Sequence, residues 1–317
     1  MYFETKTILL GASEEMCKLS IEDYILESIK LEDIDYTDEY FSLLGKEYIQ
    51  QMYPYHKDYV QGKHYIILTH ISSEKKSRED NLYYNSFFED IYTNPCNPDR
   101  FKNSPYSYKQ GCINVLKFVK KIQLIAGINV FAGHIATYRV LDNGKKELEF
   151  VIPFEIPSYK ILTQTFLFPS SKIDYENFAK EFFLELPQKE DEITLAFEFF
   201  INSLYEKNIK MSYLMLIIAF ESLLSKENEI ASNMSARYAN FMATSKKEYN
   251  AIIKDLNMLY WVRNKLVHEA YWDKEYELRN IELLRDYVRK IILQYLYDIY
   301  GNMAHKEFLE FASKKAF

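Results

Sequence analysis

Three residues near the end of one amphipathic stretch have the types and spacing for phosphodiester chemistry. Arg263, Asn264 and His268 fall within residues 260–268. A guanidinium can neutralise the charge that develops on phosphorane oxygens. An imidazole titrates near neutral pH, so it can move the proton of a ribose 2′-hydroxyl or of the leaving 5′-oxygen. The amide would orient the histidine or the phosphate. RNA supplies its own nucleophile, so we expect this chemistry to use no metal and no other cofactor.

The helix expected over residues 246–268 must position these three side chains. Its apolar stripe consists of Ile252, Ile253, Leu256, Leu259, Tyr260, Leu266 and Val267. At about 100° per residue, Arg263 falls near the centre of that stripe. Asn264 and His268 are spaced i, i+4 and share a face turned about 100° away. Ser245 precedes the helix and Glu248 follows three residues on, which predicts a capping box.

A guanidinium that faces a core needs an anionic partner, because it cannot lose its charge. The helix expected over 210–226 is apolar on every side between residues 211 and 224, which predicts a buried central helix. The only charge within that run is Glu221. We therefore expect an Arg263–Glu221 pair, joined in a bidentate fork or sharing a network beside a partly open cleft. Removing Arg263 from a buried pair would cost about 3–5 kcal/mol of stability.

The pattern along the chain predicts an α+β protein of two domains. Residues 1–186 form a mixed α/β domain, and residues 187–317 form an all-α antiparallel helical bundle. Alternating and turn-bounded segments predict strands at 2–10, 65–71, 128–141, 147–156 and 161–168, and helices at 21–30 and 113–126. Asp142-Asn143-Gly144 predicts a hairpin turn, and residues 73–111 a long loop. The bundle is expected to contain helices at 191–207, 210–226, 230–244, 246–268 and 275–300, then a short tail helix.

Composition and charge narrow the class of protein. Hydrophobic residues make up 48 % of the 317 residues, which supports a real core. The longest strongly apolar run, at 213–220, falls far short of the roughly 20 residues that span a bilayer. The opening residues lack the basic and apolar regions of a signal peptide. Cys17, Cys96 and Cys112 are scattered without metal-type spacing, so we expect reduced thiols in a cytoplasmic protein. The net charge of −7 argues against a nucleic-acid coat protein, although a local cleft can still bind a phosphate.

The candidate site resembles a known family of ribonuclease domains. Arg263-Asn264-x3-His268 matches the R-x4–6-H motif of HEPN domains, in its R-N-x3-H form. Three further segments resemble the Apea-like branch of that family: AFESLL at 219–224, SARYA at 235–239, and Leu259-Tyr260 ahead of the arginine. The resemblance covers roughly residues 191–300 and leaves the first 185 residues unexplained.

The resemblance implies a homodimer in which two motifs meet in a composite active site. It implies a metal-independent endoribonuclease that leaves a 2′,3′-cyclic phosphate, of the kind found in bacterial toxins, phage-defence and abortive-infection effectors and CRISPR-associated nucleases. Arg263, Asn264 and His268 would form its catalytic motif, and Glu221 would be a supporting carboxylate. In this branch a glycine often follows the histidine, and here the residue is Glu269. A carboxylate there would favour the protonated imidazole or repel RNA.

Two functions therefore stay open at the level of sequence. In the first, the chain is an RNA-cleaving effector whose N-terminal domain senses a trigger or restrains the nuclease, with an antitoxin or an activating ligand as partner. In the second, the HEPN-like bundle is a non-catalytic dimerisation or nucleotide- and RNA-binding module. The Arg263–Glu221 pair is then structural, and His268 only meets the last carbonyls of its helix.

Overall fold

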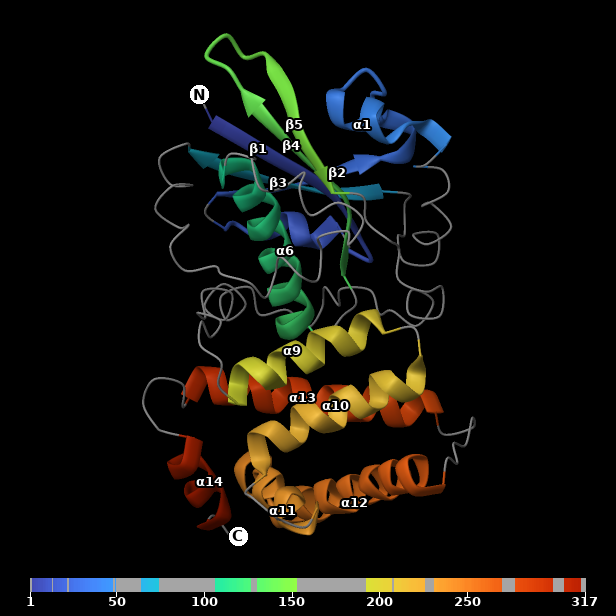
Figure 1. Ribbon diagram of the computed structural model, residues 1–317, viewed down its shortest axis with the longest axis vertical. Helices are drawn as coiled ribbons and strands as arrows, with labels where there is room; N and C mark the ends of the chain where they lie inside the picture. Colours follow the sequence, from blue (N-terminus) through green and yellow to red (C-terminus); the bar gives the residue numbers. More distant parts are fainter. Residues whose placement is uncertain are drawn as a thin grey trace. The chain divides into compact units, whose positions relative to one another are not determined.

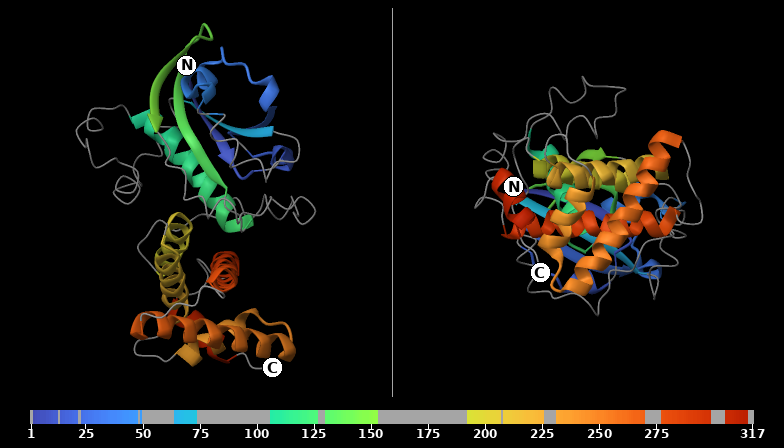
Figure 2. Two further views of the ribbon diagram at one scale, coloured as in Figure 1. Left: turned by 90° about the vertical axis from the view of Figure 1, so that its right-hand side faces the viewer. Right: turned by 90° about the horizontal axis from the view of Figure 1, so that it is seen from below.

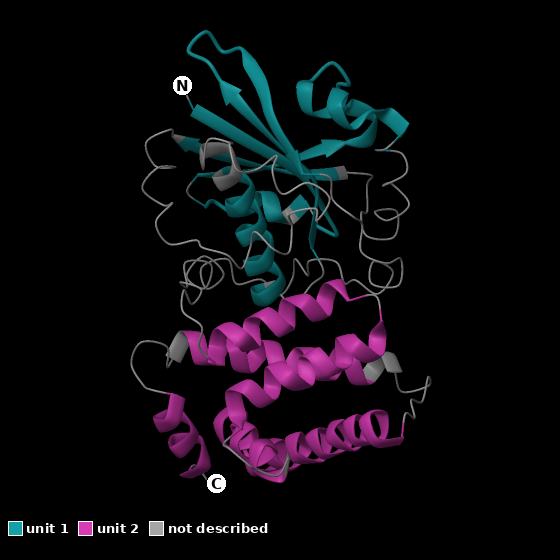
Figure 3. Ribbon diagram, viewed as in Figure 1, with its two compact units in different colours: residues 1–182 teal, residues 183–317 magenta. Residues whose placement is uncertain are grey.

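The chain divides into two compact units, Met1–Phe182 and Phe183–Phe317 (Figure 3). The structure is a computed structural model. It describes residues 2–49 except positions 13, 22 and 48, together with residues 64–73, 106–126, 130–152, 192–206, 208–225, 231–269, 277–298 and 305–314. The first unit contains an antiparallel sheet, and the described part of the second unit is helical. The chain is therefore α+β.

A five-stranded antiparallel sheet forms the centre of the first unit (Figure 1). The strands follow the order β2-β3-β1-β4-β5. Their bounds are Tyr2–Leu10 for β1, Tyr24–Lys30 for β2, His64–Ser73 for β3, Phe131–Val140 for β4 and Lys146–Ile152 for β5. The strand predicted at residues 2–10 is confirmed, as is the hairpin at residues 142–144, where Gly144 adopts φ of 80° between β4 and β5. The strand predicted at residues 161–168 lies outside the described residues.

The long helix α6, Tyr106–Ala126, packs against one face of this sheet (Figure 2). Its contact is close at Gly111, where an added Cβ would lie 2.1 Å from Thr5 Oγ1. Thr5 and Thr137 share a hydrogen bond of 3.0 Å beneath the helix. The helix begins earlier than predicted, so the end of the long loop expected at 73–111 is helical. The rest of that predicted loop, from residue 74 to 105, lies outside the described residues.

The short helix α1, Glu39–Leu44, covers part of the opposite face. Side chains alternate between the faces of a strand, and α1 meets Lys6 of β1, whereas α6 meets Thr5. The Asp38 carboxylate caps α1 by accepting from the backbone N–H groups of Tyr40 and Phe41. The Tyr40 hydroxyl donates to the carbonyl of His134 at 2.8 Å, and it accepts from the N–H of Ile8 at 3.0 Å. These bonds attach α1 to the neighbouring strands β1 and β4.

The helix predicted at residues 21–30 is wrong, because Tyr24–Lys30 is the edge strand β2. Its residues pair with β3 from Tyr24 opposite His70 to Lys30 opposite His64. The Tyr24 ring also contacts the rings of His70 and Phe118 at 4.8 Å between centroids. Pairing with the neighbouring strand and these aromatic contacts outweigh the local helical pattern.

The described part of the second unit contains six helices, and their order is the predicted one. They are α9 (Glu192–Tyr205), α10 (Ile209–Leu224), α11 (Ala231–Met242), α12 (Lys246–Glu269), α13 (Glu277–Asp298) and α14 (His305–Lys314). The short connection after α9 makes α9 and α10 a helical hairpin, which a 2.7 Å bond from Ser212 Oγ to the carbonyl of Ser203 closes. Figure 2 shows α13 nearly end-on while α12 is seen along its length, so these two helices cross. No helix in the described ranges is long and apolar enough to cross a membrane.

Aromatic rings and one buried arginine fix the interior of this unit. Phe220 of α10 contacts Tyr238 of α11 at 5.3 Å and Tyr260 of α12 at 6.3 Å between ring centroids. Tyr238 also contacts Tyr287 of α13 at 5.2 Å. The Arg237 guanidinium donates to the carbonyl of Leu224 and to the Ser313 hydroxyl, at the end of α14. The AFESLL and SARYA segments of the sequence therefore contribute to packing in this unit.

Candidate active site at the end of helix α12

The start and middle of α12 are firmly anchored. Ser245 Oγ accepts from the N–H of Glu248 at 3.2 Å, as a capping box requires. The Glu248 carboxylate does not return this bond to Ser245, because it accepts from the N–H and hydroxyl of Thr244 at 2.8 and 2.7 Å. Further along, the Tyr213 hydroxyl donates to the carbonyl of Leu259 at 2.6 Å. The buried residues of the helix are Ile252, Leu256, Leu259 and Tyr260.

Burial of α12 stops at Tyr260, which corrects the apolar stripe predicted from the sequence. Leu266 is only half-buried, and Val267 is 48 % exposed. Tyr213 and Phe220 of α10 contact the helix at Leu259 and Tyr260. The final two turns, which carry the candidate residues, therefore lie at a surface.

Arg263 lies in this partly covered segment and does not form the expected fork with Glu221. Its Nη1 donates to Asn264 Oδ1 at 3.2 Å, and no hydrogen bond or ion pair within the described residues joins it to Glu221. Arg263 is half-buried, so solvent still reaches the guanidinium, and a buried carboxylate partner is not required. The bond to Asn264 turns the guanidinium toward the face that Asn264 occupies.

Glu221 and Arg263 nevertheless influence each other as charges. Burial raises the pKa of the half-buried Glu221 carboxyl, and the positive charge of Arg263 partly opposes this shift. The same two charges act on the hydroxyl of Tyr260, whose pKa is raised chiefly by burial. Glu221, Tyr260 and Arg263 therefore share one electrostatic environment, in which burial outweighs pairing.

The helix that carries Glu221 is less buried than its sequence predicts. Most of α10 is in the core, but Met211 is 45 % exposed and Ile218 is 39 % exposed. These two residues are spaced i, i+7 and lie on one face, with Glu221 one turn beyond Ile218. The prediction that α10 is buried on every side is therefore wrong for this face. Its exposed apolar side chains are available for a partner.

Asn264 and His268 are both exposed on α12. The His268 side chain is exposed, and it makes no hydrogen bond or ion pair within the described residues. The Asn264 amide oxygen accepts from Arg263, and no bond within the described residues joins Asn264 to His268. The Glu269 carboxylate is occupied, because both of its oxygens accept from Lys265 Nζ at 2.6 Å. An effect of Glu269 on His268 or on RNA stays a prediction.

Three side chains that the candidate motif does not include form a row along the same helix. Lys265 Nζ, held by Glu269, lies 5.8 Å from the centroid of the Trp261 ring. The residues are spaced i, i+4 and i+8, which is visible in the sequence, but the exposure of Trp261 is not. The indole is 55 % exposed.

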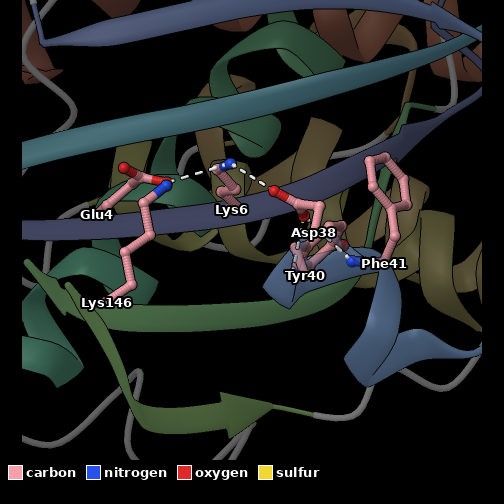
Figure 4. Close-up of polar contacts among 6 residues, drawn as sticks. All are labelled: Glu4, Lys6, Asp38, Tyr40, Phe41 and Lys146. Carbon is pink, nitrogen blue, oxygen red and sulfur yellow. Dashed lines mark hydrogen bonds and ion pairs between the residues drawn. The ribbon is translucent and has the colours of Figure 1, made fainter. Parts of the chain in front are cut away.

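A second cluster of charges, in the first unit, has a different character. Figure 4 shows Lys6 Nζ between the carboxylates of Glu4, at 3.2 Å, and Asp38, at 3.9 Å. Lys146 Nζ lies 2.8 Å from the same Glu4 oxygen. Every charge drawn has an opposite partner, so the cluster joins β1, β5 and the start of α1. Beside it, the buried hydroxyl of Tyr138 makes no hydrogen bond within the described residues.

The described histidines and cysteines of the first unit include no evident reactive group. His70 is buried, and its Nε2 lies 3.2 Å from Asn114 Nδ2. Burial lowers the pKa of His134. Burial raises the pKa of the Cys17 thiol to about 11 and that of Cys112 to about 12, so neither is a thiolate nucleophile near neutral pH. Among the described residues, no three His, Cys, Asp or Glu side chains gather as a metal site.

Comparisons with protein-family models, with curated proteins and with solved structures found no match to this chain. The function is therefore inferred from the side chains at the end of α12.

Proposed function

We propose that this chain is a metal-independent endoribonuclease whose catalytic residues are Arg263, Asn264 and His268. One observation carries the proposal: these residues lie on exposed or half-exposed turns of α12, with the guanidinium bonded to a neutral amide and the imidazole open. An arginine and a histidine buried for structural reasons would have carboxylate or carbonyl partners. Here the charged donor and the proton carrier are available to an external phosphodiester.

In the proposed reaction, His268 takes the proton of a ribose 2′-hydroxyl, which attacks the adjacent phosphorus. The bond to the 5′-oxygen breaks, that oxygen is protonated, and a 2′,3′-cyclic phosphate remains. Arg263 stabilises the negative charge on the phosphorane oxygens, and Asn264 orients the guanidinium. Glu221 tunes the charge balance around Arg263 from α10.

Helix geometry favours a composite site made from two copies of the chain. Arg263 and His268 are five residues apart, so they are separated by about 140° around the axis of α12. One helix therefore presents them toward different sides, and a second motif would complete each site. The exposed apolar side chains Met211 and Ile218 of α10 and Val267 of α12 offer area for such a contact.

The first unit and the biological setting are further parts of the proposal. A ribonuclease in a cell must be restrained, so we assign sensing of a trigger, or binding of an antitoxin or activating ligand, to the unit that contains the sheet. The setting would be a bacterial toxin or a phage-defence effector. Growth arrest on expression of the wild type, relieved by His268→Ala, would support this role.

The primary test is RNA cleavage in excess EDTA. End-labelled single-stranded RNA and tRNA are incubated with the wild type, Arg263→Ala, His268→Ala and a control, Lys254→Ala, on an exposed earlier turn of α12. We expect cleavage by the wild type and the control, with cyclic-phosphate ends, and its loss in the other two variants. Cleavage that survives both substitutions would contradict the assignment.

A non-catalytic interaction module is the second candidate function, and the exposed face of α10 favours it. Met211 and Ile218 supply apolar area that a dimer or another protein would cover whether or not RNA is cut. Equal background cleavage in all four proteins, together with a stable dimer in sedimentation, would support this function over the ribonuclease.

A further inference from the structure

The most exposed large apolar side chain in the described residues is Trp261, on α12. More than half of the indole is exposed, although Tyr260 beside it is buried. An isolated exposed leucine needs no explanation, but an exposed tryptophan leaves a large apolar ring in water. Such a ring is well suited to stacking on a ligand that is itself flat.

The Trp261 ring is held in place by its neighbours on the helix. Lys265 Nζ lies over the ring at 5.8 Å from its centroid, within the range of a cation–π contact. Lys265 is itself paired, because both oxygens of Glu269 accept from it at 2.6 Å. These contacts favour one orientation of the indole, and a ring that is ordered in advance loses less entropy when a ligand binds.

The position of the ring relates it to the candidate catalytic residues. Asn264 is i+3 and His268 is i+7 from Trp261, so all three lie on one side of α12. His268 follows the tryptophan by two turns, about 10.5 Å along the helix axis. A dinucleotide can span this distance with one base on the ring and a phosphodiester beside Asn264 and His268.

We propose that Trp261 is a nucleobase platform that holds one unpaired base of the RNA beside the phosphodiester to be cut. The proposal rests on the ribonuclease function proposed above. The local charge fits RNA: from residue 257 to 269 the helix carries Arg263 and Lys265 against Glu269, in a chain of net charge −7. A base must leave its helical stack to lie on an aromatic ring, so the substrate class is single-stranded RNA or loops.

The test measures binding of a single-stranded RNA that cannot be cleaved. The protein has two tryptophans, so a Trp272→Phe background leaves Trp261 as the sole indole reporter. The probes are a short 2′-O-methyl oligoadenylate and an abasic oligonucleotide with the same backbone. We expect the oligoadenylate to quench Trp261 fluorescence, and the abasic probe to bind more weakly without quenching it.

Variants separate stacking from other roles of the ring, with affinity measured by anisotropy of labelled probes. Trp261→Leu should weaken oligoadenylate binding roughly tenfold and leave abasic binding unchanged. Trp261→Phe should retain most of the affinity. Glu269→Gln, which loosens Lys265, should weaken binding by less than Trp261→Leu does. Met258→Ala, one turn earlier and 36 % exposed, is the matched control and should bind as the wild type does.

Three results would overturn the platform: an oligoadenylate affinity unchanged in Trp261→Leu, binding of neither probe, or a loss of affinity that accompanies dissociation of a dimer in sedimentation. The last result would make the ring a subunit contact. Failure of the ribonuclease proposal looks different, since base-dependent quenching would then occur without cleavage by the wild type. Cleavage by the wild type without quenching would overturn only the platform.

Discussion

Burial and ion pairing have opposite relative effects on pKa values in two charged clusters, the Glu4 cluster of the first unit and the Glu221–Arg263 cluster of the second. At Lys146 in the first unit, burial alone would lower the pKa, but the hydrogen bond and charge of Glu4 raise it above its ordinary value. At Glu221 in the second unit, burial raises the pKa, and the charge of Arg263 only partly opposes it. The ion pair therefore decides the direction of the pKa shift at Lys146 in the sheet, whereas burial decides it at Glu221 in α10.

This difference indicates that the Glu4 cluster of the first unit is structural. Ion pairs that satisfy one another, like Glu4 with Lys6 and Lys146, attach strands and a helix and leave little for a ligand. The end of α12 instead has a guanidinium bonded to a neutral amide and an open imidazole. A charged group that has no opposite partner in the fold is able to bind an oppositely charged ligand.

The largest expected effect is on RNA cleavage, at the exposed residues Arg263, Asn264 and His268 at the end of α12. His268→Ala should slow RNA cleavage by at least about 100-fold, because a general acid–base group contributes that much or more. The free energy of unfolding should change by less than about 0.5 kcal/mol, since the side chain is exposed. Initial cleavage rates and urea unfolding of the same preparations check both. Strong destabilisation would make His268 a structural residue and remove the contrast between the clusters.

The paired cluster should respond in the opposite manner. Glu4→Gln removes the charge shared by Lys6 and Lys146, and we expect a loss of roughly 2 kcal/mol in the free energy of unfolding, as for a charged hydrogen bond. Cleavage by the folded protein should be unaffected. Urea unfolding and cleavage rates at low temperature measure the two quantities. Cleavage lost without loss of stability would mean that the sheet cluster also has a functional role.

Tyr138 lies beside the Glu4 cluster, and its substitution should have a smaller effect on stability, in the stabilising direction. Its buried hydroxyl makes no hydrogen bond within the described residues, so Tyr138→Phe removes an unsatisfied group. We expect stabilisation of about 1 kcal/mol, seen as a higher thermal midpoint. The matched change Tyr40→Phe removes a hydroxyl that bonds to Ile8 and His134 and should destabilise the protein. A destabilised Tyr138→Phe would indicate that its hydroxyl has a partner.

The smallest expected effect is a pH dependence at Glu221. Its folded-state pKa is raised, so the folded state binds this proton more tightly than the unfolded state does. The resulting stability is fully present below the ordinary value of 4.5 and is lost as the pH rises through the folded-state pKa toward neutrality. Glu221→Gln should remove this dependence and be slightly more stable than the wild type at neutral pH.

A substitution of Arg263 tests the cause of this pH dependence. Arg263→Met removes the charge that opposes the shift, so the pKa of Glu221 should rise further and the loss of stability should move to higher pH. The thermal midpoint of each variant between pH 4.5 and neutrality checks these outcomes. Glu221→Gln less stable than the wild type at neutral pH would point to a direct Arg263–Glu221 pair in solution. The predicted cost of 3–5 kcal/mol for losing Arg263 would then apply.

Much of the fold was predictable because its patterns are local. Alternation and turn residues predicted β1 and the β4–β5 hairpin, and periodicity with a capping serine predicted α12. The edge strand β2 was not predictable, because residues 24–30 pair with a strand distant in the sequence. An edge strand exposed on one side has a weak pattern, so contacts with β3 decide its conformation.

The candidate site was also predictable only in part. Periodicity correctly placed Asn264 and His268 on one face, but it put Arg263 in a core and paired it with Glu221. Whether a helix face is covered depends on which neighbours pack against it, and the hydrogen bond and ring contact that α10 makes to α12 are at Leu259 and Tyr260. The exposure of Trp261 depends on the same packing.

The sequence by itself determined the α+β class, the order of most elements and the residues capable of phosphodiester chemistry. These depend on side-chain chemistry and on periods of two and 3.6 residues, which are properties of short segments. Only the tertiary structure decided that Glu4 is paired, that Arg263 bonds to Asn264 and that Trp261 is open to solvent. Burial and pairing are set by which elements meet and where their contact stops, and no short segment contains that information.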